Sequence, residues 1–352
     1  MSEIPKIKGR GAQLNSNNRF LANTTEYNED FAYGDEINFR TRKTKYLTEN
    51  PKKIVNKIVS PDVPNGVSVN PYQGCEHGCI YCYARNTHEY YGYSAGLDFE
   101  QKILVKKNAP ELLEKELQKK SWKVTPILFS GNTDCYQPAE KNFKLTRRML
   151  EICLKYRNPV AIITKNALIL RDIDILGQLS KLDLLHVIVS LTTLNEELRR
   201  ALEPRTVSGL KRLQIIKKLS ENGIPVGVNT APIIPSLNDH EIPELIKNAA
   251  ENGACSAGYT MVRLNGSIAQ IFTDWIYKTF PNKAEKVLNQ IKECHGGTLN
   301  DSQFGRRMRG EGKYAEHIKQ LHKISCQKYL AGRSFPAYSY DAFMRNGQFG
   351  LF

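Results

Sequence analysis

The sequence contains no hydrophobic run long enough to span a membrane. Its longest apolar stretches, such as LLHVIVSL at residues 184–191, have the length of a strand, whereas a membrane-spanning helix needs about 20 apolar residues. The first residues, MSEIPKIKGRGAQLN, lack the apolar region of a secretory signal. We therefore expect a cytoplasmic protein with no membrane association.

The sequence also shows no evident internal repeat. Hydrophobic residues make up 41% of the 352 positions and charged residues 24%, as in ordinary globular proteins with a sizeable core. A chain of this length accommodates one large α/β domain with appendages or two ordinary domains.

Acidic residues are scarce relative to basic ones, 36 against 50, which gives a formal net charge of +14. A surplus of this size attracts phosphate backbones. The basic clusters include RTRKTK at residues 40–45 and RRMR at residues 306–309. Arg306, Arg307 and Arg309 are therefore candidate nucleic-acid contacts. They are equally compatible with a solvated surface or with ion pairs to carboxylates such as Glu311.

Short apolar segments alternate with helical patterns through the middle of the chain. The predicted strands are residues 66–70, 126–130, 159–164, 184–191, 224–234 and 254–264. The amphipathic segments between them are residues 139–156, 169–182, 206–223 and 239–253. Six short strands that alternate with helical segments predict an α/β fold with a parallel sheet, either doubly wound or rolled into a full or partial barrel.

In either geometry, ligands bind where the parallel strands end. The polar interruptions of the pattern occur at these positions. They are a cysteine-rich stretch after the first strand, SGNTD (130–134), TKN (164–166), SLTT (190–193) and NTAPIIPSLND (229–239). We therefore expect the functional site at this end of the sheet.

The cysteine-rich stretch, NPYQGCEHGCIYCYAR at residues 70–85, contains Cys75, Cys79 and Cys82 but no fourth cysteine nearby, because the next is Cys135. In the cytoplasm thiols stay reduced, so this cluster indicates metal or redox chemistry rather than disulfides.

Two kinds of metal site are compatible with three cysteines. Structural zinc takes four protein ligands, so His77 or His88 would have to be the fourth. A [4Fe–4S] cluster held by three cysteines leaves one iron open to a substrate or cofactor, which makes the odd number useful. The spacing favours the cluster. A zinc-stabilised nucleic-acid-binding module and a non-catalytic iron–sulfur protein are the alternatives.

The CxxxCxxC pattern, with Tyr81 before its last cysteine, resembles the radical S-adenosylmethionine (SAM) superfamily. TDCYQPAEKNFKLTRRMLEI, ITKN, LEPRT and PIIPSLND extend the likeness to the spore photoproduct lyase-like branch, often labelled DNA repair photolyase-like. The resemblance implies a partial (β/α)6 barrel at residues 61–265. A polar N-terminal arm (1–60) would precede this core, and a C-terminal helical extension with a tail (266–352) would follow it.

The resemblance also implies an activity. Such enzymes bind a [4Fe–4S] cluster and SAM, cleave SAM reductively to a 5′-deoxyadenosyl radical, and abstract hydrogen from a substrate. An electron donor such as a flavodoxin or ferredoxin is then expected. The name of the branch suggests a nucleic acid as substrate.

Cofactor contacts follow from the same resemblance. The SAM amino group is expected at the SGNTD loop, its carboxylate at Lys165, its ribose at Ser190 and Thr192, and its adenine at Ile234. Arg205 and Asn229 are expected either to add contacts or to fix loops. The candidates in the SGNTD loop are Gly131, Asn132, Thr133 and Asp134. Tyr81, the aromatic residue of the cysteine motif, is a further candidate.

Cys135 departs from the pattern of the branch, because relatives commonly carry proline at this position. Spore photoproduct lyases use a cysteine near this loop as a hydrogen-atom donor, and Cys135 is the candidate for that role. The alternative is a buried cysteine that packs as a small hydrophobic side chain.

Overall fold

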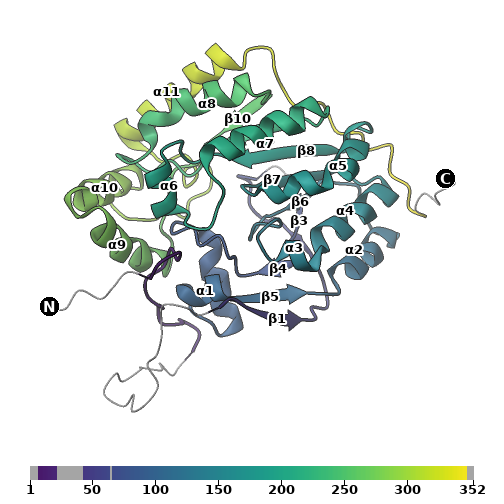
Figure 1. Cartoon of the computed structure of the whole chain (residues 1–352), viewed down its shortest axis with the longest axis horizontal. Coiled ribbons are helices and arrows are strands. Elements are labelled where there is room, and N and C mark those ends of the chain that lie inside the picture. Colours follow the sequence, from purple (N-terminus) through teal and green to yellow (C-terminus); the bar gives the residue numbers. More distant parts are fainter. Residues whose placement is uncertain (1–6, 22–42, 64–65, 347–352) are drawn as a thin grey trace.

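The computed structural model describes residues 7–21, 43–63 and 66–346 (Figure 1). Its main sheet has seven strands in the order β10-β9-β8-β7-β6-β3-β2. Six of them are parallel and match the six predicted strands: β3 (Val67–Val69), β6 (Ile127–Phe129), β7 (Val160–Thr164), β8 (Leu185–Ser190), β9 (Val226–Asn229) and β10 (Ser256–Gly258). The last two are shorter than predicted, since the chain leaves the ladder after Asn229 and Gly258.

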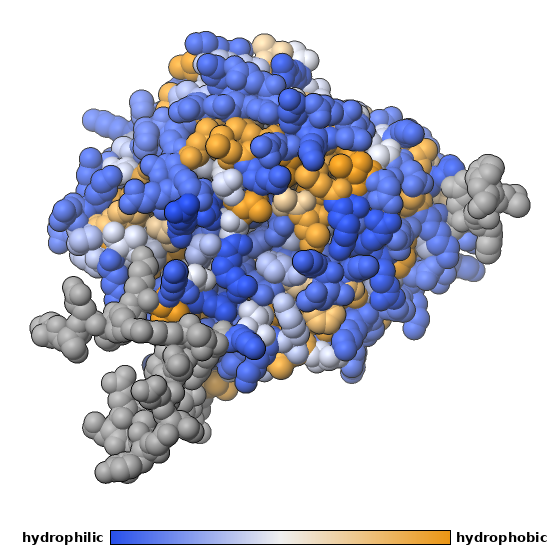
Figure 2. Space-filling model, viewed as in Figure 1, coloured by the Kyte–Doolittle hydropathy of each residue, from blue (hydrophilic) through white to orange (hydrophobic). Residues whose placement is uncertain are grey.

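The sheet is an open barrel, as predicted. At one edge β10 pairs with β9, and at the other β3 pairs with the antiparallel β2 (Val55–Lys57). Figure 1 shows the helices that follow the strands arranged around the outside of the sheet. They are α2 (Ala109–Gln118), α4 (Leu145–Tyr156), α5 (Ile173–Ser180), α7 (Gly209–Glu221) and α8 (Ile242–Glu251). Figure 2 shows that hydrophilic side chains cover most of the same face of the molecule.

Shorter helices and a C-terminal helical group complete the described fold. The short elements are η3 (Tyr83–Tyr91), α1 (Leu97–Gln101), α3 (Glu140–Phe143), η4 (Ala167–Asp172), α6 (Glu196–Leu202) and η5 (Asp239–Glu241). The C-terminal group is α9 (Ile268–Thr279), α10 (Pro281–Cys294) and α11 (Gly312–Tyr329), which packs on α8. None of the helices in these residues has the length and apolar character needed to cross a membrane.

The helix predicted at residues 139–156 is interrupted at Lys144, which has a positive φ of 52°. The Glu140 carboxylate accepts hydrogen bonds from the backbone N–H groups of Thr146 and Arg147. These N–H groups belong to the first turn of α4 and have no partner within the helix. The buried glutamate therefore caps a second helix, and the predicted single helix becomes α3 and α4.

A second, three-stranded sheet was not predicted. Its order is β1 (Lys45–Glu49), β5 (Lys102–Lys106) and β4 (Tyr72–Gln73). Two of its strands begin with lysine, and β4 has only two residues, so none shows a strong strand pattern. This sheet matters for the site because β4 lies within the cysteine-rich stretch, directly before the residues that carry the cysteines.

The two faces of the barrel strands differ in their surroundings. On β8, Leu185, Val187 and Val189 pack in the core between sheet and helices. Since strand side chains alternate, His186 and Ile188 face the barrel interior. The C-terminal tail reaches the N-terminal end of this interior, where the rings of Phe335 and Tyr338 stack on His186 with centroids 4.3 and 3.8 Å away. The tail thus covers the end of the barrel opposite the expected site.

Candidate active site at the cysteine loop

The cysteine loop, residues 74–82, follows β4 near the carboxyl end of the first barrel strand. Gly74 and Gly78 have positive φ angles of 82° and 69°. A Cβ added at Gly78 would lie 2.8 Å from Glu100 Oε2, closer than side chains tolerate. Glycine at this position therefore allows the loop to approach a buried carboxylate.

That carboxylate forms an ion pair with Arg85, at 2.6 Å, and both side chains are fully buried. The Arg85 guanidinium also donates to the backbone carbonyls of Cys79 and Gly78, at 2.9 and 3.0 Å. Glu100 accepts from the backbone N–H groups of Gly11 and Ala12. One buried pair therefore fixes the loop backbone and holds the N-terminal segment against it.

The three cysteines of the loop carry free thiols. Burial raises the pKa of each, that of Cys79 to about 12, and Cys79 and Cys82 further raise the pKa of Cys75. Cys82 packs against the small buried cluster that contains Cys75, and its backbone N–H donates to the carbonyl of Cys79 at 3.4 Å, so the three cysteines are neighbours. Because burial disfavours the thiolates, the loop needs a bound positive charge to ionise them, which coordination to metal supplies.

A single metal ion does not fit this arrangement. Within residues 7–21, 43–63 and 66–346, no three His, Cys, Asp or Glu side chains converge as one ion requires. A four-iron cluster binds each cysteine through a different iron, so its sulfurs stay further apart. The loop therefore fits a cluster better than zinc.

Neither histidine that was considered as a zinc ligand is directed at the thiols. His77 Nδ1 lies 3.5 Å from Asp134 Oδ2, and its Nε2 lies 3.0 Å from Asn166 Nδ2. Burial lowers the pKa of His77 to about 4, so the ring is neutral. His88 packs against the rings of Tyr93 and Phe99.

A fully buried carboxylate, Glu203, organises the other side of the site. Its Oε1 accepts from Lys165 Nζ at 3.2 Å, from Thr192 Oγ1 at 2.8 Å and from the Tyr81 hydroxyl. Its Oε2 is paired with the buried Arg212. Burial opposes ionisation, but Arg212 and Lys165 outweigh it and hold the pKa of Glu203 well below its usual range.

This network brings together predicted residues from different strand ends. Lys165 Nζ lies 3.1 Å from the Tyr81 hydroxyl and 3.8 Å from Cys79 Sγ, so the lysine is next to the cysteine loop. Sequence analysis missed Glu203 and Arg212. Glu203 is part of the LEPRT motif, in which Arg205 was the predicted contact. Arg205 instead lies beside the loop, 3.5 Å from Glu76 Oε1.

The polar side chains of the SGNTD loop form hydrogen bonds with neighbouring parts of the protein. Asp134 accepts from Thr164 Oγ1 at 2.8 Å and from the backbone N–H of Lys165 at 3.1 Å, and Thr133 Oγ1 donates to the carbonyl of Tyr72. The Asn132 amide donates to Gln73 and Thr87, and the Gly131 carbonyl accepts from Tyr83. These contacts hold the loop beside the cysteine loop.

The remaining cofactor candidates lie at neighbouring strand ends. Ser190 and Asn229 are register partners at the ends of β8 and β9. Thr192 Oγ1 contacts the carbonyl of Ala231 as well as Glu203. Ile234 is fully buried, and its backbone N–H donates to Asn238 Oδ1.

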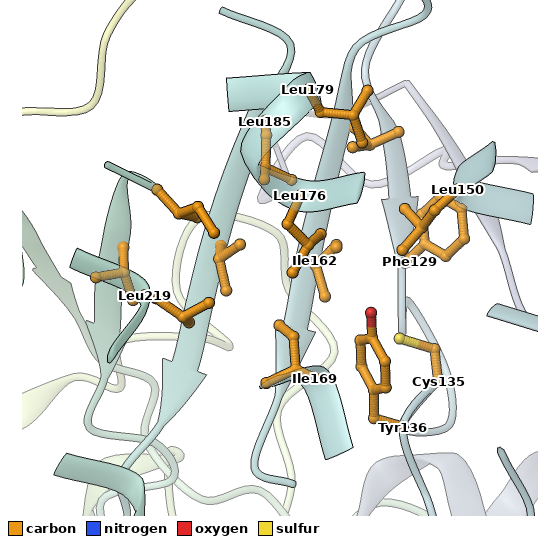
Figure 3. Packing of buried hydrophobic residues seen from close by; sticks show 14 of the residues in the cluster. Phe129, Cys135, Tyr136, Leu150, Ile162, Ile169, Leu176, Leu179, Leu185 and Leu219 are labelled. Carbon is orange, nitrogen blue, oxygen red and sulfur yellow. The ribbon is translucent and has the colours of Figure 1, made fainter. Parts of the chain in front are cut away.

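Cys135 lies in the hydrophobic core rather than among these residues. It is fully buried in the cluster that contains Phe129 and Leu150. Figure 3 shows its sulfur directed toward Tyr136, which comes next in the chain. Thr146 Oγ1 and Ser130 Oγ bond its backbone. This placement favours the packing interpretation over the hydrogen-donor interpretation.

The three C-terminal arginines have partners within the protein. Arg306 pairs with Asp301 at 2.5 Å and with Glu311 at 3.0 Å. Arg307 pairs with Asp62 at 2.6 Å, and Arg309 donates to the carbonyl of Tyr259. These contacts favour a role in tying the C-terminal segment to the barrel.

The family model of the Radical SAM superfamily matches residues 69–249, and the chain belongs to that superfamily. It is therefore an enzyme of the class that uses a [4Fe–4S] cluster and SAM. Among its relatives, an uncharacterized protein of Methanocaldococcus jannaschii is 33% identical over 70% of this chain and 88% of its own length. An uncharacterized protein of Mycobacterium tuberculosis is 32% identical over 65% of this chain and 68% of its own length. An uncharacterized protein of Acidianus two-tailed virus is 30% identical over 85% of this chain and 99% of its own length.

Solved structures of spore photoproduct lyase share the fold. A mutant of that enzyme with bound AdoMet and dinucleoside spore photoproduct has a TM-score of 0.61 and 15% sequence identity, covering 84% of this chain and 82% of its own. Its complex with dinucleoside spore photoproduct has the same TM-score and identity, with 82% and 80% covered.

Replacing Glu100 with glutamine should destabilise the protein by about 3–5 kcal/mol, because Arg85 would remain buried without a counter-charge. Urea unfolding of the cluster-free protein under reducing conditions measures this. The control is Glu116→Gln, which removes the exposed ion pair with Lys119 and should cost less than about 1 kcal/mol. Equal losses in the two variants would contradict a central role for the buried pair.

Replacing Cys135 with alanine should cost about 1 kcal/mol of stability, since it removes a buried sulfur from a packed core. The matched control is Cys153→Ala, which affects a fully buried cysteine of the same cluster. In the native protein both thiols should resist alkylation, as measured by mass spectrometry. Rapid alkylation of Cys135 in the folded enzyme would instead show an accessible thiol suited to hydrogen donation.

Proposed function

We propose that Cys75, Cys79 and Cys82 hold the [4Fe–4S] cluster and that SAM binds beside them at the carboxyl ends of the barrel strands. The observation that carries this proposal is the set of three free, neighbouring thiols on a loop that a buried ion pair holds in place. When bound and reduced, these cofactors supply a 5′-deoxyadenosyl radical that abstracts hydrogen from a substrate.

Lys165 is proposed to bind the carboxylate of SAM. Its proximity to Cys79 supports this role, and an ammonium group has three donors to share. Glu203 then acts as a positioning residue, because it holds Lys165 and Tyr81 while Arg212 balances its charge.

The other SAM contacts are proposed on the strand ends. The backbone carbonyls of residues 130–133 would accept hydrogen bonds from the amino group, since the polar side chains there are engaged. Ser190 and Thr192, at and just after the end of β8, are proposed to bind the ribose hydroxyls, with Asn229 at the end of β9 adding a contact, and Ile234 is proposed to face adenine.

The enzyme requires a reductant, and we propose a flavodoxin or ferredoxin acting in the cytoplasm. All eight cysteines are free, which supports a reducing compartment.

As substrate we propose a nucleic acid, in a reaction related to DNA repair. The net charge of +14 supports it. So does the shared fold with spore photoproduct lyase, a protein crystallised with dinucleoside spore photoproduct. Because Arg306, Arg307 and Arg309 have internal partners, we propose that the phosphate contacts lie elsewhere.

Cys79→Ala should abolish both the visible absorbance of the reconstituted cluster and the release of 5′-deoxyadenosine from SAM with dithionite. Cys255→Ala is the control, because this half-buried cysteine lies outside the loop and should leave both signals intact. Wild-type protein that binds about one zinc and no labile sulfide would contradict the proposal. A cluster whose spectrum does not respond to SAM would instead indicate a non-catalytic iron–sulfur protein.

Binding of duplex DNA by the wild type should weaken with salt, with a slope of about −0.9 in log affinity against log salt for each phosphate contact. The combined replacement of Arg306, Arg307 and Arg309 by alanine should leave that slope nearly unchanged and lower the thermal unfolding temperature, because internal ion pairs are lost. A slope flattened by about two to three would assign these arginines to phosphate after all. No binding by the wild type at low salt would refute the nucleic-acid substrate.

A further inference from the structure

Arg263 lies on the segment that leaves β10 at the carboxyl end of the barrel. The backbone on both sides of it is fixed, since the N–H of Val262 donates to Ile233 at 2.9 Å and that of Leu264 to Leu299 at 2.8 Å. Both flanking side chains are buried, whereas that of Arg263 is half-buried. The guanidinium is therefore carried by a rigid part of the fold.

This guanidinium makes no hydrogen bond or ion pair with any residue in the described part of the chain. Two carboxylates lie in its neighbourhood, but other groups bind them. Asp62 accepts from Arg307 at 2.6 Å and from the N–H of Gly305 at 2.7 Å. Asp301 accepts from Arg306 and from the N–H of Gln303.

The surroundings of Arg263 disfavour its charge. Burial and the guanidinium of Arg307 lower its pKa, and Tyr83, Asp62 and Asp301 only partly offset this. An arginine stays charged even so, and its planar donors match carboxylates and phosphates. A half-buried cation with unused donors is what an anion-binding site requires.

Tyr83 connects this position to the cysteine loop. It follows Cys82, its hydroxyl donates to the Gly131 carbonyl at 2.7 Å, and its side chain is 48% exposed. Three residues after Tyr83 in η3, the Asn86 side chain donates to the carbonyl of Asn265 at 2.7 Å, so this helix contacts the segment that carries Arg263. The helix that begins at Tyr83 thus contacts both the loop beside the cluster site and the segment of Arg263.

We propose that Arg263 binds a phosphate of the substrate at the mouth of the barrel, and that the exposed ring of Tyr83, on the helix that contacts this segment, contacts the adjoining nucleoside. This assignment rests on the proposed nucleic-acid substrate. The contact between Arg263 and the phosphate would place that substrate over the cluster site. The carboxylate of SAM has the same anionic chemistry, so the test separates the two ligands.

The test compares wild type, Arg263→Gln and Arg263→Lys as reconstituted enzymes, with a short single-stranded DNA oligonucleotide and SAM as separate probes. Arg263→Gln should weaken oligonucleotide binding about tenfold and flatten its salt slope by about 0.7, the value for one phosphate on a single strand. Arg263→Lys should retain most of the slope, because it keeps the charge. SAM affinity and iron content should not change.

Thermal unfolding provides the control for a purely structural role. Arg263→Gln should unfold at the wild-type temperature or above it, because no internal partner is lost, whereas Arg307→Gln should unfold lower because Asp62 loses its ion pair. A clear loss of stability in Arg263→Gln would overturn the proposal.

Two further outcomes would also overturn it. If Arg263→Gln weakens SAM binding and leaves oligonucleotide binding and its salt slope intact, the residue serves the cofactor. If the wild type binds the oligonucleotide and Arg263→Gln matches it in affinity and slope, the assignment of Arg263 fails while the nucleic-acid function stands. A wild type that binds no oligonucleotide at low salt refutes that function and this contact together.

Discussion

The site depends on a charge pair that has no access to water. Arg85 and Glu100 are both fully buried, and each is surrounded by backbone groups of opposite polarity. Burying two charges is costly unless every donor and acceptor is satisfied. Here the pair is satisfied by the cysteine loop and by residues 11–12, which are far apart in the sequence. The loop that carries the thiols therefore has a defined backbone only when these separate segments have assembled.

A second buried group sets the electrostatics beside the thiols. Glu203 lies between Lys165 and Arg212, so one negative charge is shared by two positive ones. These three side chains carry a net positive charge next to Cys79, which partly offsets the effect of burial on its thiolate. Tyr81 and Thr192 donate to the same carboxylate. This links the cysteine motif to the end of β8 through hydrogen bonds rather than through apolar packing.

Much of this arrangement could be predicted from the sequence. The six parallel strands were visible because buried strands are continuous apolar runs, and the cysteines because their spacing is distinctive. Arg212 was missed because a charged residue in a helical pattern normally indicates a solvated face, and Glu203 because LEPRT was interpreted through Arg205. The second sheet was missed because its strands are short or begin with lysine. The pairing of Arg306 with Glu311 was among the alternatives considered, whereas the pairing of Arg307 was missed because its partner Asp62 is distant in sequence.

The aromatic C-terminal tail is synthesised after the barrel that it covers. Phe335 and Tyr338, which stack on His186 inside the barrel, follow every barrel strand in the chain. During synthesis the strands and the cysteine loop emerge well before the residues that cover the opposite end. A nascent barrel therefore spends time with both ends exposed to solvent, and its interior is sealed on one side only late in translation. Delivery of an oxygen-sensitive cluster is best protected if it takes place after that seal has formed.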